Sequence, residues 1–243
     1  SALSTVTVPR GRVVVLLNLG LIKSREGKYD EALQRINQAL AECEDSPQPD
    51  VLGARGELFQ TIGKPNAAYD DFMKAKRSIE EVGSSVPVSL LLNIASVLTD
   101  MRRSSEALEI LQASKEAVRH AAGPAVAGHH LETGRASASA GDFATAMVHL
   151  RASCTLAKAI HDWRSASTAL YGQGRVLCEE GKYVAALECF FEAIRLPSSI
   201  PRDEMLLKRE AARCLMRLGR HTEAEPFLHR SVELARQLRT DIG

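Results

Sequence analysis

The chain has 243 residues and a formal net charge of +1, and 45% of its residues are hydrophobic while 5% are aromatic. This composition is sufficient for a buried core and excludes disorder throughout, and the balanced charge excludes a broad field for nucleic acid. The longest apolar run, residues 13–17, cannot span a bilayer and no signal sequence opens the chain. We therefore predict a soluble, cytoplasmic protein without membrane insertion or specific nucleic-acid binding.

A pattern of small and apolar residues recurs six times along the chain. A small residue is followed after seven positions by a turn residue, then by an aromatic or other turn-flanking residue, a second small residue and a large apolar one. The first copy reads Gly20, Gly27, Tyr29, Ala32 and Ile36. The first small residues lie 36 to 40 positions apart, at Gly20, Gly56, Ala95, Gly134, Gly174 and Ala212.

Each copy predicts two helices, because apolar and small residues follow 3/4 spacing on both sides of the turn. Proline, glycine and helix-capping residues separate the copies. In chain order we expect helix pairs at 13–42, 49–79, 88–118, 127–157, 164–195 and 203–238. They form one domain, 13–243, after an N-terminal extension, 1–12. The third turn, Met101 to Ser104, lacks the usual glycine and aromatic residue.

This pattern resembles the tetratricopeptide repeat family. The resemblance implies an all-α fold, a right-handed α-solenoid of six helix-turn-helix pairs. The long period resembles the repeats of kinesin light chain, of Leu-Gly-Asn-type adaptors and of sensor domains in bacterial regulators.

The sequence offers no recognisable catalytic or metal-binding motif. Five cysteines form no C-x-x-C pair, although Cys178 and Cys189 could approach across the fifth hairpin; the alternative is that they are small core residues. The adjacent His129 and His130 point about 100° apart on a helix and do not easily share a metal. Nucleotide loops and nucleophile motifs are absent. We therefore predict no enzyme activity, no cofactor and no metal.

The candidate partner-binding residues lie on the first helix of each pair, the face that the resemblance assigns to an inner groove. Arginine follows the small residue in three successive pairs, and further residues share this face at 3/4 spacing. Asparagines that suit a peptide main chain lie two positions before the small residue in pairs one and three. Whether Glu132, Glu179 and Glu210 neutralise the arginines stays open. The candidates are Asn18, Asn93, Arg135, Tyr171, Arg175, Arg209, Arg213 and Arg217.

These residues predict a non-catalytic scaffold or adaptor that binds a partner protein, peptide or helix, and arginine favours a partner with an acidic segment. The alternative is a ligand-sensing regulatory module of a larger signalling or transcription-regulating protein. The chain opens with Ser-Ala-Leu instead of methionine, so a longer parent protein also stays open.

Overall fold

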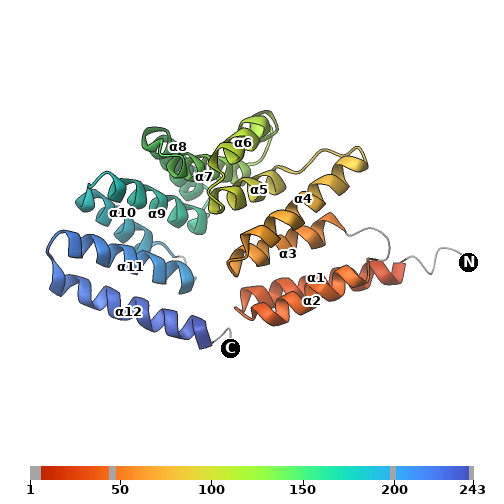
Figure 1. Cartoon of the computed structure of the whole chain (residues 1–243), viewed down its shortest axis with the longest axis horizontal. Helices are drawn as coiled ribbons and strands as arrows, with labels where there is room; N and C mark the ends of the chain where they lie inside the picture. The colour runs from red at the N-terminus through yellow and green to blue at the C-terminus, as the bar shows by residue number, and fades with distance from the viewer. Residues whose placement is uncertain (1–6, 44–47, 198–200, 241–243) are drawn as a thin grey trace, which may run out of the picture. The chain divides into compact units, whose positions relative to one another are not determined.

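The computed structural model describes residues 7–43, 48–197 and 201–240, and within them the chain forms twelve α-helices and no strand. The fold is an all-α repeat solenoid, as predicted (Figure 1). The chain divides into two compact units. The first unit holds the described residues up to Met101, and the second runs from Arg102 to Thr240. The prediction of one domain over 13–243 stays a prediction.

The first unit contains five helices, and each packs chiefly on its neighbours in the chain. The first helices of successive pairs also touch one another, α1 with α3 and α3 with α5. The helices are α1 (Thr7–Arg25), α2 (Tyr29–Ala41), α3 (Pro49–Thr61), α4 (Pro65–Glu81) and α5 (Val88–Asp100).

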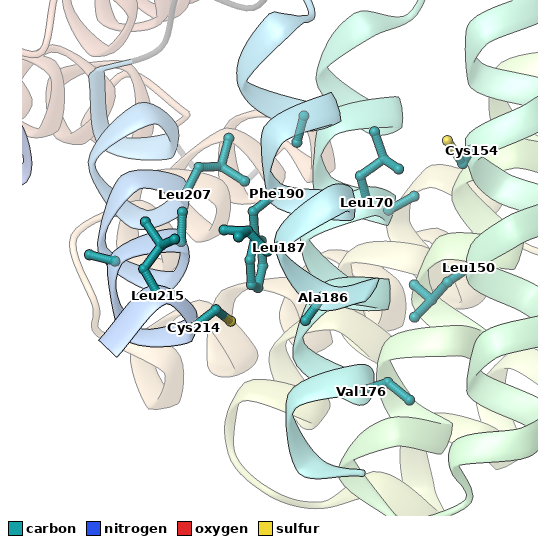
Figure 2. Packing of buried hydrophobic residues seen from close by; sticks show 14 of the residues in the cluster. Leu150, Cys154, Leu170, Val176, Ala186, Leu187, Phe190, Leu207, Cys214 and Leu215 are labelled. Atoms are coloured by element: carbon teal, nitrogen blue, oxygen red, sulfur yellow. The ribbon is translucent and has the colours of Figure 1, made fainter. Parts of the chain in front are cut away.

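The second unit contains seven helices with the same neighbour-to-neighbour packing, and α7 also touches α9. They are α6 (Ser104–Arg119), α7 (Gly123–Ser139), α8 (Phe143–Ala159), α9 (Trp163–Glu179), α10 (Tyr183–Arg195), α11 (Pro201–Arg217) and α12 (His221–Thr240). Its hydrophobic core runs from α7 to α12, and Figure 2 shows the part around Leu150, Phe190 and Leu215.

The small residues at the helix crossings have the role that the repeat predicts. A Cβ atom built on Gly174 would lie 2.5 Å from the ring of Phe190, and one on Gly56 would lie 2.5 Å from the ring of Phe72. Both rings are fully buried. The missing side chain of glycine therefore makes room for the large residue sixteen positions later, so the two helices of a pair approach closely.

Helices α9 and α11 begin one or two residues before the predicted starts, and α1 and α7 begin considerably earlier than predicted. Helix α1 begins at Thr7, inside the predicted extension 1–12, because Pro9 falls in the first turn, where the backbone N–H has no helical partner anyway. Residues 1–6 of that extension lie outside the described residues. Helix α7 begins at Gly123 instead of 127 for the same reason, with Pro124 in its first turn.

The turn inside five of the six copies places glycine in the left-handed region, with φ between 74° and 86°. In the third copy Arg102 occupies that position with φ of 63°, a conformation that costs a residue with a Cβ atom about 1–2 kcal/mol. The absence of the usual glycine from the third turn therefore has a local cost in the backbone, and we expect this turn to open more easily than the others.

The crossing glycine can be tested with Gly174→Ala. The added methyl group must displace the buried ring of Phe190, so we expect a loss of about 1–3 kcal/mol of stability in chemical denaturation. Gly53→Ala is the control, because this helical glycine has no atom within 4 Å of the Cβ position. It should gain about 0.5–1 kcal/mol from helix propensity. Equal effects of the two substitutions would contradict the role of the crossing.

The third turn can be tested with Arg102→Gly. Glycine adopts the left-handed conformation without the steric cost of a Cβ atom, so this substitution should stabilise the protein by about 0.5–1 kcal/mol. It should also slow amide hydrogen exchange over residues 98–108. Arg102→Ala keeps the backbone penalty while removing the charge, so it should show neither effect. A gain of the same size in both variants would assign the cost to the arginine side chain and not to the backbone.

Candidate functional site

A polar pocket of about 300 Å³ opens on the second unit, between residues of α9 and α11 and the start of α10. Three of the candidate arginines lie in it. Its lining consists of Arg175, Cys178, Glu179, Tyr183, Glu210, Arg213, Cys214 and Arg217. Arginines outnumber glutamates in this lining, so the pocket carries a local positive charge although the whole chain is nearly neutral.

Two of the predicted arginines hold buried glutamates on their own helices. In α7, Arg135 donates to Glu132 over 2.8 Å, and in α11, Arg213 donates to Glu210 over 2.7 Å. Both glutamates are buried, where a carboxylate without a partner would be strongly destabilising. The fourth and sixth copies thus share the same ion pair, formed by a glutamate and the arginine three positions after it.

The fifth copy breaks this pattern, because Gly172 stands where the other two copies have glutamate. Arg175 is exposed and forms no ion pair with the described residues. The same is true of Arg217 at the end of α11, and both line the pocket. Glu179, the third glutamate considered as a neutralising partner, also makes no ion pair within the described part of the chain. The available charge of the pocket thus comes from Arg175 and Arg217.

Glu210 is the centre of a small ion-pair network. Its Oε1 accepts from Arg209 over 3.0 Å and its Oε2 accepts from Arg213 over 2.7 Å. Both arginine side chains remain about half exposed or more. They compensate the buried carboxylate and still present N–H groups to solvent.

Tyr171 lies half-buried on α9 and packs its ring against Phe190 of α10, with the ring centres 6.1 Å apart. Burial raises the pKa of its phenol, an effect that the charge of Arg175 opposes. Tyr171 does not line the pocket. Arg135 and Arg209 do not line it either, so the structure gathers only Arg175, Arg213 and Arg217 there.

The two asparagine candidates lie in the first unit. Asn18 is exposed on α1. Asn93 on α5 donates from its Nδ2 to the Oε1 of Glu57 on α3 over 2.9 Å. That bond links the first helices of the second and third pairs, so one amide N–H of Asn93 is used within the protein and is not open to a partner.

The sequence prediction missed a contact between two cysteines that line the pocket. The Sγ atoms of Cys178 on α9 and Cys214 on α11 lie 3.3 Å apart. The suggested pairing of Cys178 with Cys189 is wrong in this structure. Cys189 comes directly before Phe190, and adjacent helical residues point about 100° apart, so it does not share the Phe190 crossing with α9. The available signal was a spacing of 36 positions, close to the step from Gly174 to Ala212 in the same two copies.

A second cluster brings together histidines of α7 and α8. The Nδ1 atoms of His130 and His149 lie 2.9 Å apart, so one neutral ring donates to the other. His129 points elsewhere and contacts the carbonyl oxygen of Leu111 over 2.9 Å, which agrees with the prediction that the adjacent histidines do not act together. No group of three or more His, Cys, Asp or Glu residues suited to a metal occurs in the described ranges.

Comparisons with known proteins agree with the repeat. The tetratricopeptide repeat model matches residues 15–50. No curated protein matches the chain. Across the described helices, none combines the length and apolar character needed to cross a bilayer.

Solved structures share the fold along most of the chain. NprR in complex with its cognate peptide NprX has a TM-score of 0.74 at 15% identity, covering 97% of this chain and 69% of NprR. Rap protein complexed with competence and sporulation factor has a TM-score of 0.70 at 16% identity, covering 95% and 76%. A thermophilic tetratricopeptide protein of Thermus thermophilus has a TM-score of 0.65 at 19% identity, covering 84% and 99%.

At these identities the similarity shows the fold alone. The class is therefore a tetratricopeptide-like helical solenoid. The match to the tetratricopeptide repeat model covers residues 15–50, so membership of that family for the whole chain stays a prediction.

The histidine pair predicts a pH dependence of stability. Burial first, and neighbouring positive charge second, lower the pKa of both His130 and His149 below the ordinary 6.5. The unfolded chain then binds more protons, so stability is complete above about pH 6.5 and falls as the pH drops below it. We expect a lower thermal midpoint at pH 5.5 than at pH 7.5.

His149→Asn removes one titrating ring of the pair and keeps a polar side chain. This substitution should reduce the difference between the two midpoints by about half. Replacing the exposed His221 on α12 should leave the difference unchanged. An unaltered pH dependence in His149→Asn would assign the effect to other groups.

Proposed function

We propose that this protein is a non-catalytic scaffold that binds a partner protein or peptide on the first helices of its repeats, and that an acidic segment of the partner docks in the α9–α11 pocket. The observation that carries the proposal is the exposed Arg175. The equivalent arginines in the fourth and sixth copies are paired with a buried glutamate three positions earlier, and the fifth copy has Gly172 at the place of that glutamate. Its guanidinium is available to a partner.

Arginine suits this role because its planar fork binds a carboxylate through two parallel N–H···O bonds. Arg175 and Arg217 approach the pocket from different helices, so one acidic side chain or chain terminus could contact both. Arg213 adds positive charge beside them, while Glu179 and Glu210 limit the net charge. This mixed lining favours a defined acidic group over any polyanion.

The solved structures give the proposal independent support. Two of those with the same fold, NprR and Rap, are complexes, one with a cognate peptide and the other with a named factor. Helical solenoids present extended surfaces suited to such ligands. The alternative is a ligand-sensing module of a larger regulator. Such a module would bind its ligand on the same surface, and it would differ from a scaffold by a regulated domain attached to the repeats.

The remaining candidates have subsidiary places in this proposal. Arg135, Arg209 and Tyr171 lie on helices of the second unit outside the pocket lining, and Asn18 and Asn93 belong to the first unit. We propose them as contacts for flanking parts of the partner. The five cysteines are free thiols, which favours a reducing compartment, so we also propose a cytoplasmic location.

The acidic-partner proposal is tested with the double substitution Arg175→Gln and Arg217→Gln. Selection from a bead-displayed random peptide library should enrich Asp and Glu on the wild-type protein. The selected peptides should bind the variant at least tenfold more weakly, equal to about 1.4 kcal/mol, with a much smaller dependence on salt. Affinity is measured by fluorescence anisotropy.

The matched control is Arg151→Gln with Arg236→Gln, two exposed arginines on α8 and α12 outside the pocket. It removes the same net charge and should leave affinity and salt dependence near the wild-type values. Circular dichroism should show intact helices in both variants, because none of the four arginines makes an ion pair with the described residues. Equal weakening by the two double variants would mean that only the overall charge matters.

A further inference from the structure

We propose that Cys178 and Cys214 form an oxidation-sensitive dithiol, which a hydroperoxide converts into a disulfide that joins α9 to α11. This is a modification site within the second unit, and it does not depend on the partner-binding proposal. Its basis is the 3.3 Å contact between the two sulfur atoms, which belong to successive repeats, in a pocket that is open to a small oxidant.

The geometry is close to that of a disulfide. An S–S bond is about 2.05 Å long, so the two sulfur atoms need to approach by only about 1.2 Å. Cys214 is 1% exposed, whereas Cys178 is partly exposed and lines the pocket. A small oxidant that enters the pocket therefore reaches Cys178 before Cys214.

The surroundings divide the roles of the two thiols. The hydrogen bond from Cys214 lowers the pKa of Cys178, and Arg213 acts in the same direction, while burial and the carboxylates of Glu210 and Glu179 oppose the shift. The same hydrogen bond and burial raise the pKa of Cys214. Cys178 is thus the more readily formed thiolate, the species that attacks oxidants, and Cys214 is the thiol that follows.

The reaction balances with a hydroperoxide as the two-electron oxidant. The thiolate of Cys178 attacks one peroxide oxygen, the O–O bond breaks, and Cys178 becomes a sulfenic acid while hydroxide, or alkoxide from an organic peroxide, takes up a proton and leaves. The sulfur of Cys214 then attacks the sulfur of Cys178. The S–S bond forms, the S–O bond breaks, and the departing hydroxide takes the proton of Cys214 to leave as water.

The other cysteines lack these features. Burial raises the pKa of Cys189 to about 11 and also raises that of Cys154, so neither forms a thiolate easily. Cys43 of the first unit donates its S–H to the carbonyl oxygen of Ala39 over 3.2 Å. Only Cys178 combines access from the pocket, a nearby arginine and a second sulfur atom in contact with it.

The disulfide would close a loop over 36 positions in the chain and fix two helices that belong to successive repeats. Such a crosslink restricts the unfolded chain and so favours the folded state. In a repeat protein each pair is stabilised mainly by its neighbours, so a covalent bond between α9 and α11 should stabilise the region from α9 to α12 in particular.

The test uses the full chain, reduced and then treated with hydrogen peroxide. Peptide mapping by mass spectrometry should show a linked pair that contains Cys178 and Cys214, and dithiothreitol should reverse it. The thermal midpoint of the oxidised protein should rise by roughly 5–10 °C. Cys43→Ser should behave like the wild type in both measurements. Absence of the linked peptides at a dose that oxidises Cys43 would overturn the proposal.

Two variants separate the roles of the thiols. Cys214→Ser should stop at the sulfenic acid of Cys178, which dimedone traps, and should show no rise in the midpoint. Cys178→Ser should lose both the trapped species and the disulfide. Phenylarsine oxide, which needs two neighbouring thiols, should bind the wild type and neither variant. Retention of arsenical binding by both variants, or faster dimedone labelling at Cys189 than at Cys178, would contradict the proposed pair.

Discussion

The structure depends on the close approach of the two helices in each pair, which requires a residue without a large side chain at the crossing. Gly174 over the ring of Phe190 is the clearest case, because a Cβ atom would lie 2.5 Å from that ring. The approach fixes the rotation of the first helix about its axis, since the glycine must face inward. Residues one position further on, such as Arg175, are then held on a predictable side. A packing constraint in the core thus determines which side chains of the first helix are exposed to solvent.

Buried carboxylates are the second constraint on that face, and arginine compensates each of them. Asp71 is held by Arg55 at 2.7 Å, Glu132 by Arg135 and Glu210 by Arg213. These arginines serve the fold first, because a buried carboxylate that loses its partner destabilises the protein by several kcal/mol. The row of candidate arginines in the sequence therefore overstates the positive charge available to a partner. Among the arginines that line the pocket, Arg175 and Arg217 are the two without an ion pair to the described residues.

The repeat allowed most of the fold to be predicted, because helix periodicity, turn glycines and crossing residues are local signals. The crossing residue Gly56 and its partner Phe72 could be found by spacing alone. Contacts between successive repeats could not, since they depend on the small rotation from one pair to the next. For this reason the sequence pointed only to an approach of Cys178 and Cys189 within one hairpin, or to two core residues, and not to Cys214 in the next repeat. The contact of His130 with His149 also needed the relative rotation of two helices.

The two proposals for the pocket have one electrostatic element in common, the positive charge of its arginines. In the proposed function, Arg175 and Arg213 attract a carboxylate of the partner, and the charge of Arg213 also favours the thiolate of Cys178 over its thiol. An acidic group bound beside Arg175 would cancel part of that charge and would cover the partly exposed sulfur of Cys178. Both effects slow attack on a peroxide. If both proposals hold, an acidic partner in the pocket disfavours the thiolate of Cys178, and ionisation of Cys178 weakens binding of that partner by the same free energy.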